Sequence, residues 1–87
     1  MEVIVAPEAK KQIKKLPKFL QIAVIEKLKK LGLGIVSGIT KLTGYKDVFR
    51  IRVGDYRVVY RILNNRIYVV LIGHRREVYK LLSRLFK

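Results

Sequence analysis

The residues of this chain best suited to chemistry are the arginines of FRIRVGDYRVVYRI (residues 49–62) and of GHRREVY (residues 73–79). The first segment alternates apolar and basic residues on both sides of a Gly-Asp pair, which predicts a β-hairpin with a two-residue turn. In that hairpin Arg52 lies directly opposite Arg57, and like charges at facing positions destabilise a strand pair. We therefore expect the pair to hold an anion, and the fork of a guanidinium group suits a phosphate.

Further groups are predicted to gather at this pair. The expected register places Ile72 and Gly73 beside Arg57 and Tyr56, so His74 and Arg75 should emerge near the two arginines. Tyr79 follows Arg75 by one helical turn and can point the same way. Such a set suits a phosphodiester, because guanidinium groups bind the non-bridging oxygens and stabilise charge that develops in the transition state. A tyrosine can hydrogen-bond the sugar or stack on a base.

The net charge indicates a polyanionic partner. There are 20 Lys and Arg against 6 Asp and Glu, which gives a formal net charge of +14. A field of that size favours nucleic acid, an anionic membrane or an acidic protein. All eight arginines lie between Arg50 and Arg84, whereas the first 43 residues contain nine lysines. Since arginine offers a bidentate fork and lysine a hydrated point charge, we expect the binding face in the C-terminal half.

Length and composition limit the organisation of the chain. We expect residues 1–87 to form a single domain, because so short a chain has no room for two cores. The absence of cysteine excludes disulfides and thiolate metal sites. No apolar stretch is long enough to span a membrane, and the start, MEVIVAPE, lacks the basic segment of a signal peptide. We therefore expect a cytoplasmic protein with no membrane partner.

Two N-terminal helices are predicted to support the binding face. A short strand at residues 2–6 precedes Pro7, which is favoured as the first residue of a helix. Pro17 can open a second helix, whose apolar residues recur at helical spacing as far as Leu31. Glycines at positions 32, 34 and 38 predict a loop after it.

Three strands and a last helix should follow. The strands are expected at residues 47–53, 56–63 and 66–72, with turns at Gly54-Asp55 and Asn64-Asn65, and the helix from about residue 76. This predicts an α+β fold that runs from an N-terminal strand through a helical hairpin and a three-stranded antiparallel β-meander to a C-terminal helix. The sheet should pack on the two N-terminal helices.

Alternation along the strands predicts one dry and one basic face of the sheet. The core face should comprise Phe49, Ile51, Val53, Tyr56, Val58, Tyr60, Ile62, Ile67, Val69 and Leu71. The opposite face should collect Arg50, Arg52, Arg57 and Arg61, with Tyr68 alongside.

The order of these elements, together with FRIR (49–52), YRVVY (56–60) and GHRREVY (73–79), resembles the RelE toxins of the RelE/ParE superfamily over nearly the whole chain. The resemblance implies the toxin of a type II toxin–antitoxin system, an endoribonuclease that cleaves mRNA in the ribosomal A site and so inhibits translation. It implies attack by the 2′-hydroxyl, no metal and no small-molecule cofactor. The implied partners are the ribosome, mRNA and an antitoxin, which charge complementarity predicts to be acidic.

The resemblance also assigns roles to residues of this sequence. The implied catalytic set is Arg50, Arg52, Arg57, Arg75 and Tyr79. Several relatives carry lysine at the first two positions, but arginine does not lose its proton in proteins. We therefore assign Arg50 and Arg52 to phosphate positioning and charge stabilisation, and the general base stays open between Tyr79 and His74. The residues predicted to bind RNA are Arg61, Tyr68, His74 and Arg76.

Two other functions use the same residues. A toxin of the ParE branch shares the fold but acts on DNA gyrase through protein contacts, and the basic or tyrosine residues at all the RelE-type positions argue against it. A non-enzymatic RNA- or ribosome-binding module would bind in a salt-dependent way and leave RNA intact. In a purely structural interpretation, the arginines form a solvated sheet face and Tyr79 packs on the sheet.

Overall fold

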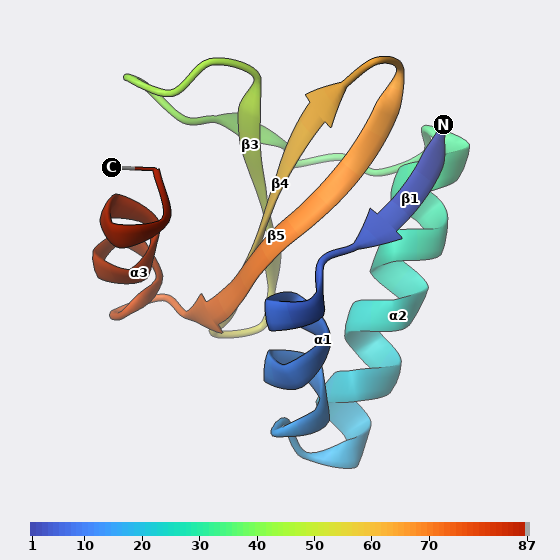
Figure 1. Cartoon of the computed structure of the whole chain (residues 1–87). Coiled ribbons are helices and arrows are strands. Elements are labelled where there is room, and N and C mark those ends of the chain that lie inside the picture. Colours follow the sequence, from blue (N-terminus) through green and yellow to red (C-terminus); the bar gives the residue numbers. More distant parts are fainter. Residues whose placement is uncertain (87) are drawn as a thin grey trace.

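The computed structural model describes residues 1–86, in which a five-stranded sheet carries two helices on one face and one on the other (Figure 1). In chain order the elements are β1 (Glu2–Val5), α1 (Pro7–Lys14), α2 (Lys18–Leu33), β2 (Thr40–Lys41), β3 (Val48–Val53), β4 (Tyr56–Leu63), β5 (Arg66–His74) and α3 (Val78–Leu85). The strand order is β1-β5-β4-β3-β2, with β1 parallel to β5 and the other neighbours antiparallel. The predicted α+β fold is confirmed, and the short edge strand β2 is an addition to it.

Prolines begin the helical hairpin as predicted, but its second helix runs further than expected. Pro7 is the first residue of α1 and Pro17 is the N-cap of α2. Gly32 belongs to α2 and not to the predicted loop. Because glycine has no side chain, the helix can lie close to the chain at β1 there. A Cβ atom there would lie 3.1 Å from the Met1 carbonyl oxygen. The helix ends at Leu33, and its C-cap is Gly34, whose left-handed φ of 75° suits glycine.

Both predicted hairpins form, with the predicted turns. Gly54 has a φ of 58°, and Asn64 and Asn65 have φ values of 50° and 60°, which match the twist of two-residue hairpins. The register of the first hairpin is also as predicted. Its pairs include Val53 with Tyr56, Arg52 with Arg57, and Arg50 with Val59.

The main core lies between the sheet and the two N-terminal helices. Buried members from α2 include Val24, Leu28 and Leu31. The strands contribute Ile51, Val53, Val58, Tyr60, Ile67, Val69 and Ile72. No helix within residues 1–86 is long and apolar enough to cross a membrane.

The opposite face is not uniformly basic, and on this point the prediction was wrong. Helix α3 covers part of it through a second cluster made of Leu42, Val48, Val59, Leu71, Val78 and Leu82. Leu71, which we expected in the main core, is on this side because β5 bulges. Tyr60 pairs with Val69 but Val59 pairs with Leu71, so Val70 is an extra residue that reverses the alternation beyond it.

Candidate functional site

Arg52 and Arg57 face each other on the sheet face that carries α3. Arg57 donates hydrogen bonds from Nη1 to the carbonyl oxygens of Tyr56 at 3.1 Å and Gly54 at 3.3 Å. These bonds hold its guanidinium group at the end of the β3–β4 hairpin. Arg52 is exposed, and Arg50 lies two residues earlier on the same face of β3, half-buried and opposite Val59.

No acidic side chain neutralises this arginine pair within the part of the chain that the structure describes. The ion pairs there join Arg66 to Glu2 at 3.0 Å and Arg75 to Asp55 at 4.0 Å. The second of these is long and exposed, so it holds Arg75 only weakly. The facing pair therefore keeps its repulsion, which a bound anion would relieve.

The end of β5 brings Arg75 to the same end of the sheet. The backbone N–H of Arg75 donates to the carbonyl oxygen of Asp55, in the hairpin turn, at 2.8 Å. Gly73 pairs with Arg57 across the β4–β5 ladder. Arg75 is exposed, so its side chain is free to extend towards a ligand held at the turn.

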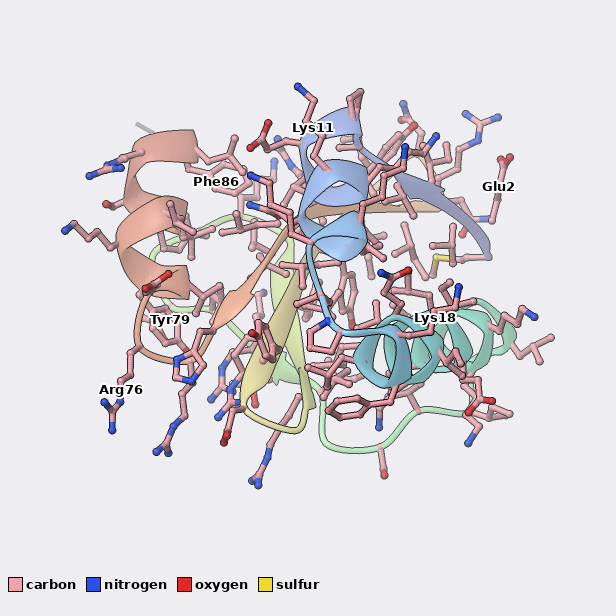
Figure 2. The ribbon with its side chains drawn as sticks, turned by 90° about the horizontal axis from the view of Figure 1, so that it is seen from below. Glu2, Lys11, Lys18, Arg76, Tyr79 and Phe86 are labelled. Carbon is pink, nitrogen blue, oxygen red and sulfur yellow. The ribbon has the colours of Figure 1, made fainter. Side chains whose placement is uncertain are left out.

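Helix α3 presents Tyr79 to solvent directly after this segment. Val78 and Leu82 are buried against the sheet, at 0% and 1% exposure, whereas Tyr79 is 46% exposed. The tyrosine is therefore not a core residue, contrary to the structural interpretation. Figure 2 shows Tyr79 and Arg76 at the start of α3, away from α2 and Lys18. The helix begins at Val78 rather than near Arg76.

His74 does not join the arginines, and this expectation was wrong. The bulge in β5 shifts the register by one residue, so His74 pairs with Tyr56. The two ring centroids lie 5.7 Å apart, edge to face, and Tyr56 packs against the main core. The imidazole is therefore on the face that α1 and α2 cover. Its Nδ1 accepts a hydrogen bond from the Arg76 backbone N–H at 3.2 Å.

Arg61 and Tyr68 lie farther along the sheet and face each other across β4 and β5. At about 3.3 Å per residue, Arg61 is about 13 Å along β4 from Arg57. Its guanidinium carbon is 5.9 Å from the Phe86 ring centroid, and its buried Nε has no hydrogen-bond partner within residues 1–86. A side-chain hydrogen bond with Tyr68, followed by the hydrogen bond and negative charge of Glu2, raises the pKa of Arg66 above its ordinary value. The structure thus separates these two residues from the cluster at the hairpin turn.

One polar residue that the sequence did not single out supports the end of β5. The Gln12 side chain, from α1, accepts a hydrogen bond at Oε1 from the Ile72 backbone N–H at 2.7 Å. A lone glutamine on an amphipathic helix gives no signal for this role in the sequence. Among residues 1–86, no group of three or more His, Asp or Glu side chains is arranged to hold a metal ion.

Residues 3–79 match the family model of the ParE toxin of type II toxin–antitoxin systems, parDE. The chain belongs to this toxin family, within the RelE/ParE superfamily. No curated protein matches the sequence of this toxin significantly. The predicted superfamily is therefore confirmed.

Solved structures of RelE toxins share the fold. A chain of the RelB–RelE complex from Methanococcus jannaschii is 22% identical, with a TM-score of 0.77, and the match covers 90% of this toxin and 96% of that chain. A chain of the RelE–RelB complex from Pyrococcus horikoshii is 27% identical, with a TM-score of 0.74, and the match covers 85% of this toxin and 93% of that chain. The isolated E. coli RelE toxin is 22% identical, with a TM-score of 0.73, and the match covers 99% of this toxin and 98% of that chain.

Proposed function

We propose that this toxin is an endoribonuclease that cleaves mRNA in the ribosomal A site, by attack of the substrate's own 2′-hydroxyl and without a metal. The observation that carries the proposal is the facing pair Arg52 and Arg57, which no acid neutralises within residues 1–86. A hydrogen bond from the Arg75 backbone N–H to the carbonyl oxygen of Asp55 brings a third arginine to the same end of the sheet.

In the proposed reaction, the 2′-oxygen forms a bond to phosphorus and the bond from phosphorus to the 5′-oxygen breaks. The leaving 5′-oxygen takes a proton from water, and the products are a 2′,3′-cyclic phosphate and a 5′-hydroxyl. The arginines bind the non-bridging oxygens and stabilise the extra charge of the pentacoordinate intermediate. Tyr79, as the phenolate, is the candidate to accept the 2′-hydroxyl proton and become the neutral phenol, since His74 lies on the other face of the sheet.

The proposed partners follow from the reaction and from the relatives. The ribosome would orient the mRNA, which explains how so small an enzyme could work without an extended RNA cleft. Several similar structures are complexes of RelE with RelB antitoxins. We therefore propose an antitoxin for this toxin as well, acidic where it covers the arginines. A ribosome-dependent toxin acts in the cytoplasm, and we propose that location.

Inhibition of DNA gyrase is the second candidate function, because the matching family model is that of the ParE toxins. Such an activity would act through protein contacts and would not need a phosphate to be bound between Arg52 and Arg57. The two candidates therefore differ in their response to loss of these arginines and in their target.

The deciding experiment is primer extension on a reporter mRNA incubated with the toxin, with and without translating ribosomes. We expect cuts inside A-site codons only when ribosomes are present, and their loss in Arg57→Ala and Arg75→Ala. Arg66→Ala is a matched control, because Arg66 pairs with Glu2 at the other end of the sheet. No cuts under either condition, with inhibited supercoiling by gyrase, would establish the second candidate instead.

A further inference from the structure

Helix α2 is apolar on its outer side as well as on the side that packs against the sheet. Its inner side contributes to the main core. Four further large apolar residues of the helix are between 45% and 74% exposed, namely Phe19, Ile22, Ile25 and Leu33. A helix that only covered the sheet would carry polar residues there. Figure 1 shows α2 at the edge of the molecule, where a partner could reach this side.

The outer side of α2 has the residue spacing of a coiled-coil seam. Five exposed positions follow one another in alternating steps of three and four residues, namely Phe19, Ile22, Glu26, Lys29 and Leu33. At 3.6 residues per turn they lie within about 80° of the helix circumference. Alternating steps of three and four are the spacing by which one helix packs along another. The seam therefore suits a second helix.

The seam is a ridge with a groove on each side. On one side, Ile25 and Lys29 border an apolar groove that extends to Val3 and Val5 of β1. On the other side, Glu26 borders a groove that extends to the turn between β3 and β4. Nothing within residues 1–86 fills these grooves, so the ridge is accessible along its length.

The two charges in the middle of the seam determine how a second copy of α2 could pack on the first. Glu26 and Lys29 form no ion pair within residues 1–86. In a parallel pair in register, each would face the same residue of the other copy, and the like charges would repel. In an antiparallel pair with a two-fold axis between residues 27 and 28, each Glu26 faces Lys29 of the other copy. The seam is therefore complementary to itself in the antiparallel direction.

The same antiparallel register brings the apolar ends of the seam together. Ile22 of one copy faces Leu33 of the other, and Phe19 packs on that leucine from one turn away. Because the arrangement has a closed two-fold symmetry, every one of these contacts occurs twice. We propose that the outer side of α2 binds a second copy of this toxin, with the two α2 helices antiparallel. The inference does not depend on the proposed nuclease function.

The size of this interface predicts a weak dimer. With 16 residues, α2 is about 24 Å long, and a single pair of helices of that length buries less than the roughly 800 Å² per partner of a standard interface. Each chain also has a net charge of +14, which opposes association. We therefore expect a reversible equilibrium between monomer and dimer in the micromolar range or above.

Sedimentation equilibrium of the free toxin, from low micromolar to near-millimolar concentration, tests for the dimer. Moderate salt screens the repulsion between the two chains more than it screens charges in contact. Leu33→Glu should weaken dimerisation at least about tenfold, since it would bury an unpaired carboxylate. Leu63→Glu, at the end of β4, is the matched control, because Leu63 is also exposed (46%) but lies outside α2. Circular dichroism checks that both variants fold.

Charge reversal tests the register of the two helices. Glu26→Lys should weaken the dimer about tenfold, because it replaces two attractive contacts by two repulsive ones. Adding Lys29→Glu to this variant should restore the dimer, because opposite charges would face each other again.

Disulfide trapping tests the direction of the two helices. The chain has no cysteine, so introduced cysteines report on their own positions alone. With oxidised glutathione, Ile22→Cys and Leu33→Cys should be linked when the two variants are mixed, because these positions face each other. Neither variant alone should be linked, since the two copies of residue 22 would lie about 16 Å apart along the helices.

A toxin that stays monomeric over the whole range of concentrations would overturn the proposal. So would a dimer that Leu33→Glu leaves intact, because that dimer would use another surface. Disulfides formed by each cysteine variant alone would show a parallel pair instead. If the double charge reversal fails to restore the dimer, Glu26 does not face Lys29 and the proposed register is wrong.

Discussion

Arg52 and Arg57 form a pair that folding disfavours and anion binding favours, so their two roles can be separated by experiment. The strands place the two residues at facing positions, where opposite charges stabilise a strand pair and like charges destabilise it. A substitution that reverses one charge should therefore improve folding while it removes the binding site. A purely structural role would not produce this opposition.

We predict that Arg52→Glu raises the free energy of unfolding by about 0.2 to 1 kcal/mol, because the introduced carboxylate would face Arg57. The same change should lower cleavage at least about 100-fold, since an anion would no longer be held or stabilised there. Urea denaturation measures the first effect and primer extension the second. Lys29→Glu makes the same change in charge on the exposed surface of α2 and should have neither effect. A destabilised Arg52→Glu variant, or one that cleaves normally, contradicts this assignment.

At the scale of elements, the position of Tyr79 depends on how α3 packs on the sheet. Leu82 is 1% exposed within the cluster that holds α3, whereas Leu85, on the same helix, is 48% exposed. We predict that Leu82→Ala lowers the free energy of unfolding by about 2 to 4 kcal/mol and reduces cleavage more than binding of RNA, because Tyr79 loses its fixed position. Leu85→Ala should change stability by less than about 0.5 kcal/mol. Equal effects of the two substitutions on cleavage would show that α3 packing does not position Tyr79.

A second prediction at this scale concerns Gln12, which is in α1 and holds the end of β5. Gln12→Leu would leave the part-buried Ile72 N–H without its acceptor, which costs about 1 to 3 kcal/mol. Hydrogen exchange should then be faster at Ile72 than in the wild type, while the amide of Tyr60, in the middle of β4 and paired with Val69, stays protected. Lys11→Leu, on the exposed side of α1, serves as the control. If Ile72 exchanges at the same rate in both variants, the hydrogen bond does not fix the strand end.

The elements that sequence could predict are those with a local chemical signal. Gly54 and the Asn64-Asn65 pair mark turns that need positive φ, and the first of these turns fixes the register of Arg52 with Arg57. The bulge at Val70 has no such signal, because it interrupts the run IYVVLI, in which no glycine occurs and both faces bury apolar residues. Sequence periodicity therefore assigned Leu71 to the wrong core. The same shift of one residue explains why His74 was expected beside the arginines.

At the scale of the whole molecule, the net charge of +14 is divided between two surfaces with different chemistry. The lysines of α1 and α2 are spread over exposed helix surface, and Figure 2 shows Lys11 and Lys18 far apart on it. Arg52 and Arg57, by contrast, face each other at one end of the sheet. A spread of point charges attracts any polyanion, whereas a cluster of guanidinium groups makes defined phosphate contacts.

Salt dependence distinguishes these two contributions. For single-stranded RNA, the logarithm of the binding constant falls with the logarithm of salt concentration by about 0.7 for each phosphate contact. We predict that Arg50→Ala, Arg52→Ala and Arg57→Ala together reduce the steepness of this dependence by about 2 for a short RNA oligonucleotide, since three contacts are lost. The triple variant Lys11→Ala, Lys14→Ala and Lys18→Ala removes the same charge and should leave the slope nearly unchanged. Fluorescence anisotropy at several salt concentrations gives both slopes. Equal losses in the two variants would mean that RNA is held by overall charge and not by the arginine cluster.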